Sequence, residues 1–207
     1  MIILKRIKRC RDLKKKCIPC VISVFWLSIL QIVFKFERWH VWSGYSCSPY
    51  KKKCVDLANE MIKPSTCVEI GCGLGDIITR IQAKECIGLD ISGPVIKAAS
   101  FYNFKHKSVR FIKGSLEFFD NHNHSVDLLI AINWMHMLDK KEIIELYSEH
   151  IKQNKFNYIM IDESWVSSIH ENRHNFGNYF PNNLRIVYKI PHDYGCRDIV
   201  VYKNTKV

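Results

Sequence analysis

The stretch Val68-Glu69-Ile70-Gly71-Cys72-Gly73-Leu74-Gly75-Asp76 decides the fold. An apolar run from Thr66 to Ile70 breaks into three alternating glycines, and apolar residues then recur at helical spacings of three and four at Leu74, Ile77, Ile78 and Ile81. A strand, a tight turn and a helix in this order open an α/β sheet of the kind that binds nucleotides. Glycine allows unusual backbone angles and close approach of a ligand. Exposed N–H groups and a positive helix end would suit a polar or anionic ligand.

The glycine spacing narrows the choice of nucleotide. A dinucleotide fingerprint reads G-x-G-x-x-G, whereas Asp76 follows Gly75 here and the spacing is G-x-G-x-G. An acid, Glu69, also stands two residues before the first glycine. A second apolar segment, Cys86 to Leu89, ends in Asp90, whose carboxylate could accept hydrogen bonds from both hydroxyls of a ribose. The spacing therefore argues against a nicotinamide oxidoreductase.

This set of residues resembles the class I S-adenosylmethionine-dependent methyltransferases, and the resemblance follows the strand pattern from about residue 66 to residue 203. It implies S-adenosylmethionine as the cofactor. It also implies a Rossmann-like α/β fold, with a mostly parallel seven-stranded sheet, a C-terminal antiparallel hairpin and helices on both faces. On this likeness Glu69 would lie near the methionine ammonium, Gly71 and Gly73 beneath the amino-acid part of the cofactor, and Asp90 on its ribose.

The same resemblance implies an adenine site after the third predicted strand, Val109 to Ile112. Leu116 would pack on the adenine ring. Many relatives carry an acid at the position of Ser115, and Glu117 or a backbone carbonyl could take its place here. The cofactor-binding set that we expect is Glu69, Gly71, Cys72, Gly73, Gly75, Asp90, Ile91, Ser115, Leu116 and Asn133.

The rest of the chain supplies the remaining strands. Apolar runs predict a fourth and a fifth parallel strand and then a hairpin. These runs are Leu128 to Ile132, Tyr158 to Ile161, Leu184 to Ile190 and Ile199 to Tyr202. In an open α/β sheet the ligand crevice lies at the carboxyl ends of the strands, where the strand order reverses. Residues 133–136, which follow the fourth strand, should therefore border the reacting methyl group.

Methyl transfer from a sulfonium is an in-line displacement at carbon, so the protein mainly aligns the acceptor and excludes water. A sugar hydroxyl would need a base, and His136 has a suitable ordinary pKa of about 6.5. Asp162 is a second candidate, and a carboxylate acceptor would need no base. For contact with the acceptor we expect His40, Trp134, Glu163 and His170. Simple packing or a place in an exposed loop is the structural alternative for these side chains.

Residues 1–36 differ from the domain that we expect over residues 37–207. Residues 1–16 carry eight basic side chains and one acid, a net charge of +7 out of +11, and 18 uncharged residues follow before Lys35. In a helix over this segment a narrow polar stripe would separate apolar side chains, at Ser23, Ser28, Gln31, Lys35 and Arg38. This pattern is typical of a helix lying on the cytoplasmic surface of a membrane. Packing on the domain or on a partner subunit, and a short spanning helix, remain as alternatives.

The charge distribution and the cysteine content argue against several other classes of protein. Because most of the positive charge lies in residues 1–16, a globally basic nucleic-acid binder is not indicated. Cysteines within the predicted core and turn favour reduced thiols and a cytoplasmic protein. Cys17-x-x-Cys20 has no second pair at ligand spacing, so we expect no metal site. The sequence leaves the oligomeric state open.

A narrower resemblance concerns the acceptor. Trp39-His40, Pro49-Tyr50-Lys51-Lys52 and the glycine stretch look like the methyltransferases found among bacterial surface-polysaccharide genes. This likeness implies a small-molecule or glycan-precursor acceptor, with a sugar hydroxyl as the methylated group. Two other classes stay open: an RNA methyltransferase that uses the basic tail, and a non-catalytic protein that binds S-adenosylmethionine.

Overall fold

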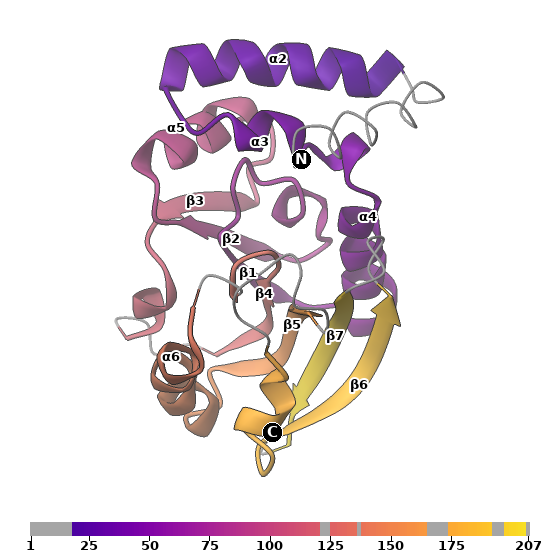
Figure 1. Ribbon diagram of the computed structural model, residues 1–207, viewed down its shortest axis with the longest axis vertical. Coiled ribbons are helices and arrows are strands. Elements are labelled where there is room, and N and C mark those ends of the chain that lie inside the picture. The colour runs from indigo at the N-terminus through magenta and orange to yellow at the C-terminus, as the bar shows by residue number, and fades with distance from the viewer. Residues whose placement is uncertain (1–17, 121–124, 136–137, 165–173, 192–196, 206–207) are drawn as a thin grey trace, which may run out of the picture.

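One seven-stranded sheet organises the computed structural model, which describes residues 18–120, 125–135, 138–164, 174–191 and 197–205 (Figure 1). The strand order is β3-β2-β1-β4-β5-β7-β6. Strands β1 to β5 pair in parallel, and β7 pairs antiparallel with both β5 and β6. The bounds are β1 Thr66–Ile70, β2 Glu85–Asp90, β3 Val109–Lys113, β4 Val126–Ala131, β5 Phe156–Ser164, β6 Leu184–Pro191 and β7 Arg197–Asn204. The Rossmann-like fold with a C-terminal antiparallel pair is confirmed.

The register of the central strands places the glycine turn at the reversal of the strand order. Cys67 of β1 pairs with Cys86 of β2 on one side and with Leu128 of β4 on the other. The carboxyl ends of all three strands therefore meet at one edge. Because β1, β2 and β4 are covered on both faces, their sequences are apolar nearly throughout rather than alternating.

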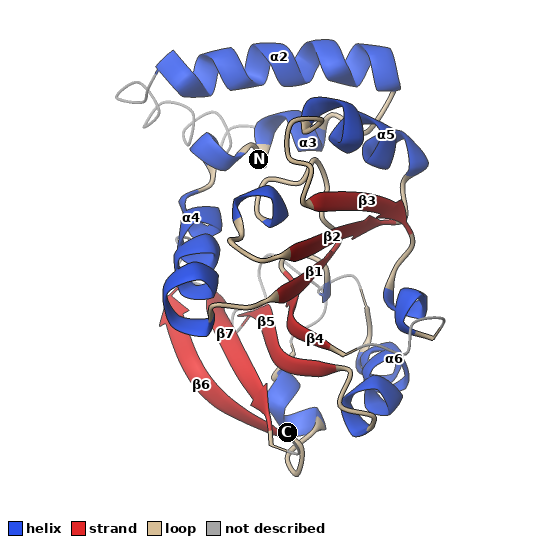
Figure 2. Ribbon diagram, turned by 180° about the vertical axis from the view of Figure 1, so that it is seen from behind, coloured by secondary structure: helices blue, strands red, loops and turns tan. Residues whose placement is uncertain are grey.

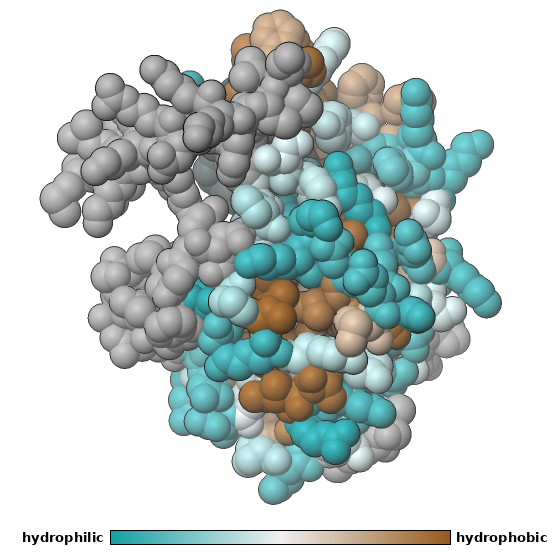
Figure 3. Space-filling view, turned by 90° about the vertical axis from the view of Figure 1, so that its right-hand side faces the viewer, coloured by the Kyte–Doolittle hydropathy of each residue, from teal (hydrophilic) through white to brown (hydrophobic). Residues whose placement is uncertain are grey.

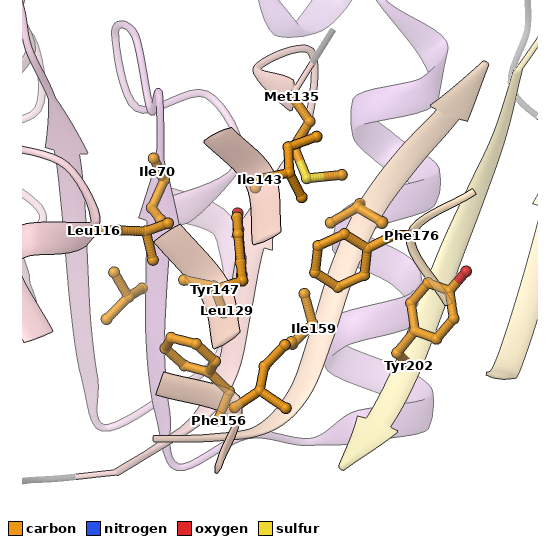
Figure 4. Close-up of a cluster of buried hydrophobic side chains, with 14 of the residues drawn as sticks. Ile70, Leu116, Leu129, Met135, Ile143, Tyr147, Phe156, Ile159, Phe176 and Tyr202 are labelled. Carbon is orange, nitrogen blue, oxygen red and sulfur yellow. The ribbon is translucent and has the colours of Figure 1, made fainter. Parts of the chain in front are cut away.

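Helices cover both faces of the sheet (Figure 2). On one face lie α4 Pro49–Asp56 and the π-helical stretch η3 Leu57–Ile62. On the other lies α6 Lys140–Lys152, with a capping box of Asp139 and Glu142 at its start. Ile143 and Tyr147 of α6 are completely buried against side chains of β1, β4, β5 and β7 (Figure 4). Helix α5 Gly93–Tyr102 follows β2.

The predicted helix after the glycine turn is wrong. Residues 71–84, all of which the structure describes, form turns and one short 3-10 helix, η4 Ile78–Arg80, before β2 begins at Glu85. Ile77, Ile78 and Thr79 are β-branched and disfavour a helix, and only nine residues separate Gly75 from Glu85. The polarity of the turn therefore comes from individual N–H groups rather than from a helix dipole.

The apolar N-terminal segment forms α2 Ile18–Phe34, which lies across α5 and the short helix α3 Trp39–Trp42 (Figures 1 and 2). Its own side chains Leu27 and Leu30 are buried on the face toward the domain. The predicted polar stripe is turned away from solvent in part, since Ser28 Oγ donates to the carbonyl of Val24 and Gln31 Nε2 donates to the carbonyl of Phe36. The large apolar side chains of α2 that are exposed instead are Ile22, Phe25, Trp26, Ile29, Ile32 and Val33. Figure 3 shows apolar residues, in brown, at the top of the molecule.

The length of α2 bears on the question of a membrane span. It has 17 residues, which at about 1.5 Å per residue gives roughly 26 Å, less than the roughly 30 Å hydrocarbon core of a bilayer. Among the helices of the described ranges, none is both long and apolar enough to cross a membrane.

Candidate active site

The glycine turn is left-handed at each of its three glycines, with φ angles of 65° at Gly71, 55° at Gly73 and 81° at Gly75. A Cβ atom at Gly71 would lie 3.0 Å from Cδ1 of Trp134, and one at Gly73 would lie 3.2 Å from Nδ1 of His40. Two side chains that the sequence predicted for the acceptor, Trp134 and His40, thus stand directly against the turn. The packing of Trp134 and His40 leaves little room for a side chain at Gly71 or Gly73.

Gly75 is required for packing as well as for its backbone angle. A Cβ atom there would lie 2.6 Å from Cζ of Phe111, an impossible contact at an unfavourable φ. We expect Gly75→Ala to lower the free energy of unfolding by about 2–4 kcal/mol, measured by urea denaturation. Gly93→Ala is the matched control, because its Cβ would meet only Lys113, at 3.9 Å, and its φ is not left-handed. Equal stability of the two variants would contradict this role of Gly75.

Asp90 links the turn to the end of β2. Its Oδ2 accepts a hydrogen bond from the Gly73 N–H at 3.1 Å, and its Oδ1 accepts one from the Ser92 N–H at 2.9 Å. The side chain is 9% exposed, and burial raises the pKa of the carboxyl group. A carboxylate held at this place keeps lone pairs for the hydroxyl groups of a ligand. Ile91, the next residue, is 69% exposed and can lie against a ligand held by Asp90.

Glu69 is a buried acid at the end of β1. It is 4% exposed, its Oε2 accepts a hydrogen bond from the Ile78 N–H at 2.9 Å, and burial raises its pKa to about 8. The nearby positive charge of Lys51 opposes this rise of the pKa. Lys51 Nζ itself donates to Asp76 Oδ2 at 2.7 Å and to the carbonyl of Ser43. A carboxyl group in this environment favours a cationic ligand, which would make its charged form more stable.

His40 and Cys72 complete the turn. Burial lowers the pKa of His40 to about 4, so the imidazole is neutral near pH 7. The ring of Trp39 stacks on it with centroids 3.5 Å apart. The Cys72 N–H donates to the carbonyl of Leu89 at 2.9 Å, and burial raises the pKa of its thiol. Cys72 therefore fixes the backbone of the turn to β2 and has no character of a reactive thiolate.

The predicted adenine residues lie at the end of β3. The Ser115 N–H donates to Glu117 Oε1 at 3.0 Å, so the carboxylate of Glu117 lies beside Ser115. Leu116 is completely buried in the core.

Asn133, at the end of β4, is fixed by its neighbours. It is left-handed, with φ 59°, and its N–H donates to Asp162 Oδ1 at 2.7 Å while its Nδ2 donates to the Tyr50 hydroxyl at 2.8 Å. Arg197 Nη1 donates to Asn133 Oδ1 and, at 2.5 Å, to Asp162 Oδ2. One oxygen of Asp162 thus accepts from the Asn133 N–H and the other is in a buried ion pair with Arg197, which suits a residue that positions Asn133 and Trp134 better than a general base.

Of the other residues predicted at the acceptor, Glu163 holds two structural hydrogen bonds. Glu163 Oε1 accepts hydrogen bonds from the Phe176 N–H at 2.7 Å and the Tyr202 hydroxyl at 2.6 Å, and so fastens the 3-10 helix η7 Phe176–Tyr179 to the sheet. His136 and His170 lie outside the described residues. In the ranges that the structure does describe, no group of three or more His, Cys, Asp and Glu side chains could hold a metal ion.

Sequence reasoning missed Lys51 and Arg197 as members of this region. Lys51 lies three and seven residues before Cys54 and Ala58, on the buried face of α4. Arg197 lies two and four residues before Ile199 and Val201, on a buried face of β7. A basic residue in phase with an apolar face was the available signal in both cases.

The comparisons with known proteins agree with this geometry. A family model described as "Methyltransferase domain" matches residues 67–155. The N-methyltransferase NodS from Bradyrhizobium japonicum WM9, in complex with S-adenosyl-L-homocysteine, superimposes with a TM-score of 0.67 at 11% identity over 88% of this chain and 99% of its own. A comparison with curated proteins finds no match.

Two further solved structures have the same fold. The mitomycin 7-O-methyltransferase MmcR has a TM-score of 0.62 at 14% identity and matches 81% of this chain and 57% of its own. Magnesium protoporphyrin IX methyltransferase from Synechocystis PCC 6803, with bound S-adenosylmethionine, has a TM-score of 0.58 at 12% identity, over 75% of this chain and 80% of its own.

The fold is that of the class I S-adenosylmethionine-dependent methyltransferases. The matched methyltransferase domain covers residues 67–155 and contains the glycine turn.

Proposed function

We propose that this methyltransferase transfers the methyl group to a sugar hydroxyl of a glycan precursor at the cytoplasmic surface of a membrane. One observation carries the proposal: the glycine turn lies directly beneath α3 and α2, and the outer face of α2 is a row of exposed apolar side chains. An acceptor attached to a lipid would reach the turn from that side.

Each residue at the turn would contact a different part of the cofactor. Glu69 pairs with the ammonium group, the backbone at Gly71 and Gly73 supports the amino-acid part, and Asp90 accepts hydrogen bonds from the ribose. Residues 115–117 and Ile91 border the adenine. The bound cofactor supplies a methyl group already activated on a sulfonium. These residues fit it, since the turn offers a buried acid and a cradle that a Cβ would fill.

For the acceptor, the proposal uses the opposite end of the turn. Asn133 and Trp134 border the reacting atoms, and the Asp162–Arg197 pair holds them in place. Trp134 offers an aromatic face to the apolar side of a sugar ring. His136 is the proposed base that takes the hydroxyl proton, and His40 and His170 complete the acceptor region. The neighbours are named N- and O-methyltransferases, so the fold accommodates either acceptor atom.

The positive charge before α2 and the apolar surface of α2 both support a location at a membrane. Residues 1–16 carry a net charge of +7 immediately before α2, and Lys35 and Arg38 follow it. The exposed fractions of the outer side chains reach 62% at Phe25, 56% at Trp26 and 72% at Ile32. Basic residues beside an amphipathic helix favour an anionic membrane surface.

Mass spectrometry of lipid-linked sugars from cells with and without the protein tests the acceptor. We expect a glycan precursor that loses one methyl group when the protein is absent. Unchanged lipid-linked sugars, together with methylation of an added RNA that weakens steeply with salt, would favour the RNA methyltransferase instead. Binding of the cofactor with no methylated product in any fraction would favour the non-catalytic alternative.

Cell fractionation tests the location. Phe25→Ser with Trp26→Ser is expected to shift the protein from the membrane fraction to the supernatant, because two large apolar side chains leave the outer face. Ser125→Ala, an exposed change just before β4, is the control. Finding the unaltered protein entirely in the supernatant would contradict the proposed location.

A further inference from the structure

We infer that α2 couples the membrane to the cofactor site, so that binding to an anionic membrane surface and binding of the cofactor strengthen each other. The inference rests on the proposed function, because it assigns the outer face of α2 to the membrane. It adds that α2 is part of the support of the glycine turn and not a separate anchor.

The first connection runs through the inner face of α2. Leu27 and Leu30 belong to one buried cluster with Val41 of α3 and Leu74. Leu74 stands between Gly73 and Gly75, inside the turn itself, and is 5% exposed. The Leu74 carbonyl also accepts a hydrogen bond from Asn103 Nδ2 at 2.8 Å, which ties it to α5. A displacement of α2 would therefore remove the cover of a residue within the cofactor turn.

The second connection runs through α3. His40 lies against Gly73, and the Phe36 ring, in the segment that joins α2 to α3, meets the His40 ring edge-on with centroids 5.8 Å apart. Beyond α3, the Ser43 carbonyl accepts a hydrogen bond from Lys51, which pairs with Asp76 at the end of the turn. The middle of the turn, at Gly73, and its end, at Asp76, are thus both linked to the segment that follows α2.

The exposed side chains on the outer face of α2 indicate the kind of surface that it binds. Its six large apolar side chains are between 37% and 72% exposed, and Trp39 and Trp42 of α3 are 57% and 58% exposed. In water this face stays exposed while α2 is docked, whereas the interfacial zone of a bilayer accommodates its tryptophan and aliphatic side chains. The +7 charge of residues 1–16 selects a bilayer with anionic lipids.

Thermodynamic linkage relates the binding of the bilayer to the binding of the cofactor. If the bilayer and the cofactor both favour the same docked arrangement of α2, α3 and the turn, each must raise the affinity for the other by one common factor. We expect a factor of at least about 5, the lower end of typical coupling between two sites.

The experiment uses the full chain, S-adenosylhomocysteine as a cofactor probe that cannot react, and vesicles of phosphatidylglycerol and phosphatidylcholine. Calorimetry measures the dissociation constant of S-adenosylhomocysteine with and without vesicles. Sedimentation measures vesicle binding with and without saturating S-adenosylhomocysteine. Both affinities should increase by the same factor, and vesicles of phosphatidylcholine alone should have little effect.

Two variants separate the faces of α2. Phe25→Ser with Trp26→Ser should abolish vesicle binding and leave the lipid-free affinity for S-adenosylhomocysteine within about twofold. Leu30→Ala loosens the inner face and should retain vesicle binding while the coupling factor falls toward 1. Thermal unfolding of each variant establishes that it is folded.

The outcomes distinguish the inference from the proposed function. Vesicle binding with no change in the affinity for S-adenosylhomocysteine overturns the coupling and leaves the membrane location standing. Absence of vesicle binding overturns both. A dimer that Phe25→Ser with Trp26→Ser dissociates, without vesicle binding, would assign the outer face of α2 to a second copy of the chain and also overturn both.

Discussion

Replacing Asp90 with alanine is expected to weaken the affinity for S-adenosylmethionine about 100- to 1,000-fold. A charged acceptor that holds two ribose hydroxyls contributes about 1.5 kcal/mol or more for each hydrogen bond, and about 1.4 kcal/mol corresponds to a factor of ten. The variant also loses the acceptor for the Gly73 N–H, which shapes the turn. Calorimetry with S-adenosylmethionine measures the effect directly.

Asp90→Asn is the matched control. It keeps the shape of the side chain and one acceptor oxygen, so its affinity should lie between those of the alanine variant and the unaltered protein. His136→Ala should instead lower turnover and leave the affinity for the cofactor nearly unchanged, because we assign His136 to the acceptor. Equal losses of cofactor affinity in Asp90→Ala and His136→Ala would refute this division of roles.

Replacing Glu69 with glutamine should stabilise the cofactor-free protein and weaken its affinity for the cofactor. The pKa of Glu69 is about 8 in the folded protein against an ordinary value of 4.5. Between these values the folded state keeps a proton that the unfolded state has released, so stability falls as the pH rises from about 4.5 to 8. Glutamine does not titrate, and it can still accept the hydrogen bond from Ile78.

The gain should be on the order of 2–4 kcal/mol at pH 8, since each unit of pKa difference corresponds to about 1.4 kcal/mol. Urea denaturation from pH 5 to pH 9 measures it, and the two curves should converge toward pH 5. Cofactor affinity should fall about tenfold or more, because the ammonium group loses a charged partner. Parallel stability curves for the two proteins over the whole pH range would show that Glu69 does not have the raised pKa.

The same shift predicts proton release when the cofactor binds. An ammonium group beside Glu69 favours the carboxylate, so a proton leaves the protein near pH 7. Calorimetry in buffers of different ionisation enthalpy should detect up to about one proton released per cofactor, and none for Glu69→Gln. Equal proton release by both proteins would place the proton elsewhere.

Much of the fold could be predicted from local sequence. The five residues of the predicted run Thr66–Ile70 coincide with β1, and the predicted β2, β3 and β5 differ from the observed strands mainly at their ends. Buried parallel strands leave a strong signal because both faces must be apolar. The helix predicted after Gly75 failed for a local reason, since a short β-branched segment between two strands could not sustain one.

The partners of each site residue could not be predicted, because they come from distant parts of the chain. Nothing near Asp162 in the sequence indicates that Arg197, 35 residues later, occupies its carboxylate. Nothing near Gly73 indicates that His40 covers it. The periodicity of α2 separates polar from apolar side chains, but it does not determine which face of the helix packs against the domain.

The sequence by itself therefore determined the strands, the glycine turn and the two acids at the ends of β1 and β2. These features depend on neighbours a few residues apart, through backbone angles and side-chain periodicity. Only the tertiary structure decided that Asp162 is paired with Arg197, that His40 and Trp134 both contact the turn, and that α2 exposes its large apolar side chains. Pairing of charges and choice of the buried face depend on which distant surfaces come together, and the packing of the whole chain sets that.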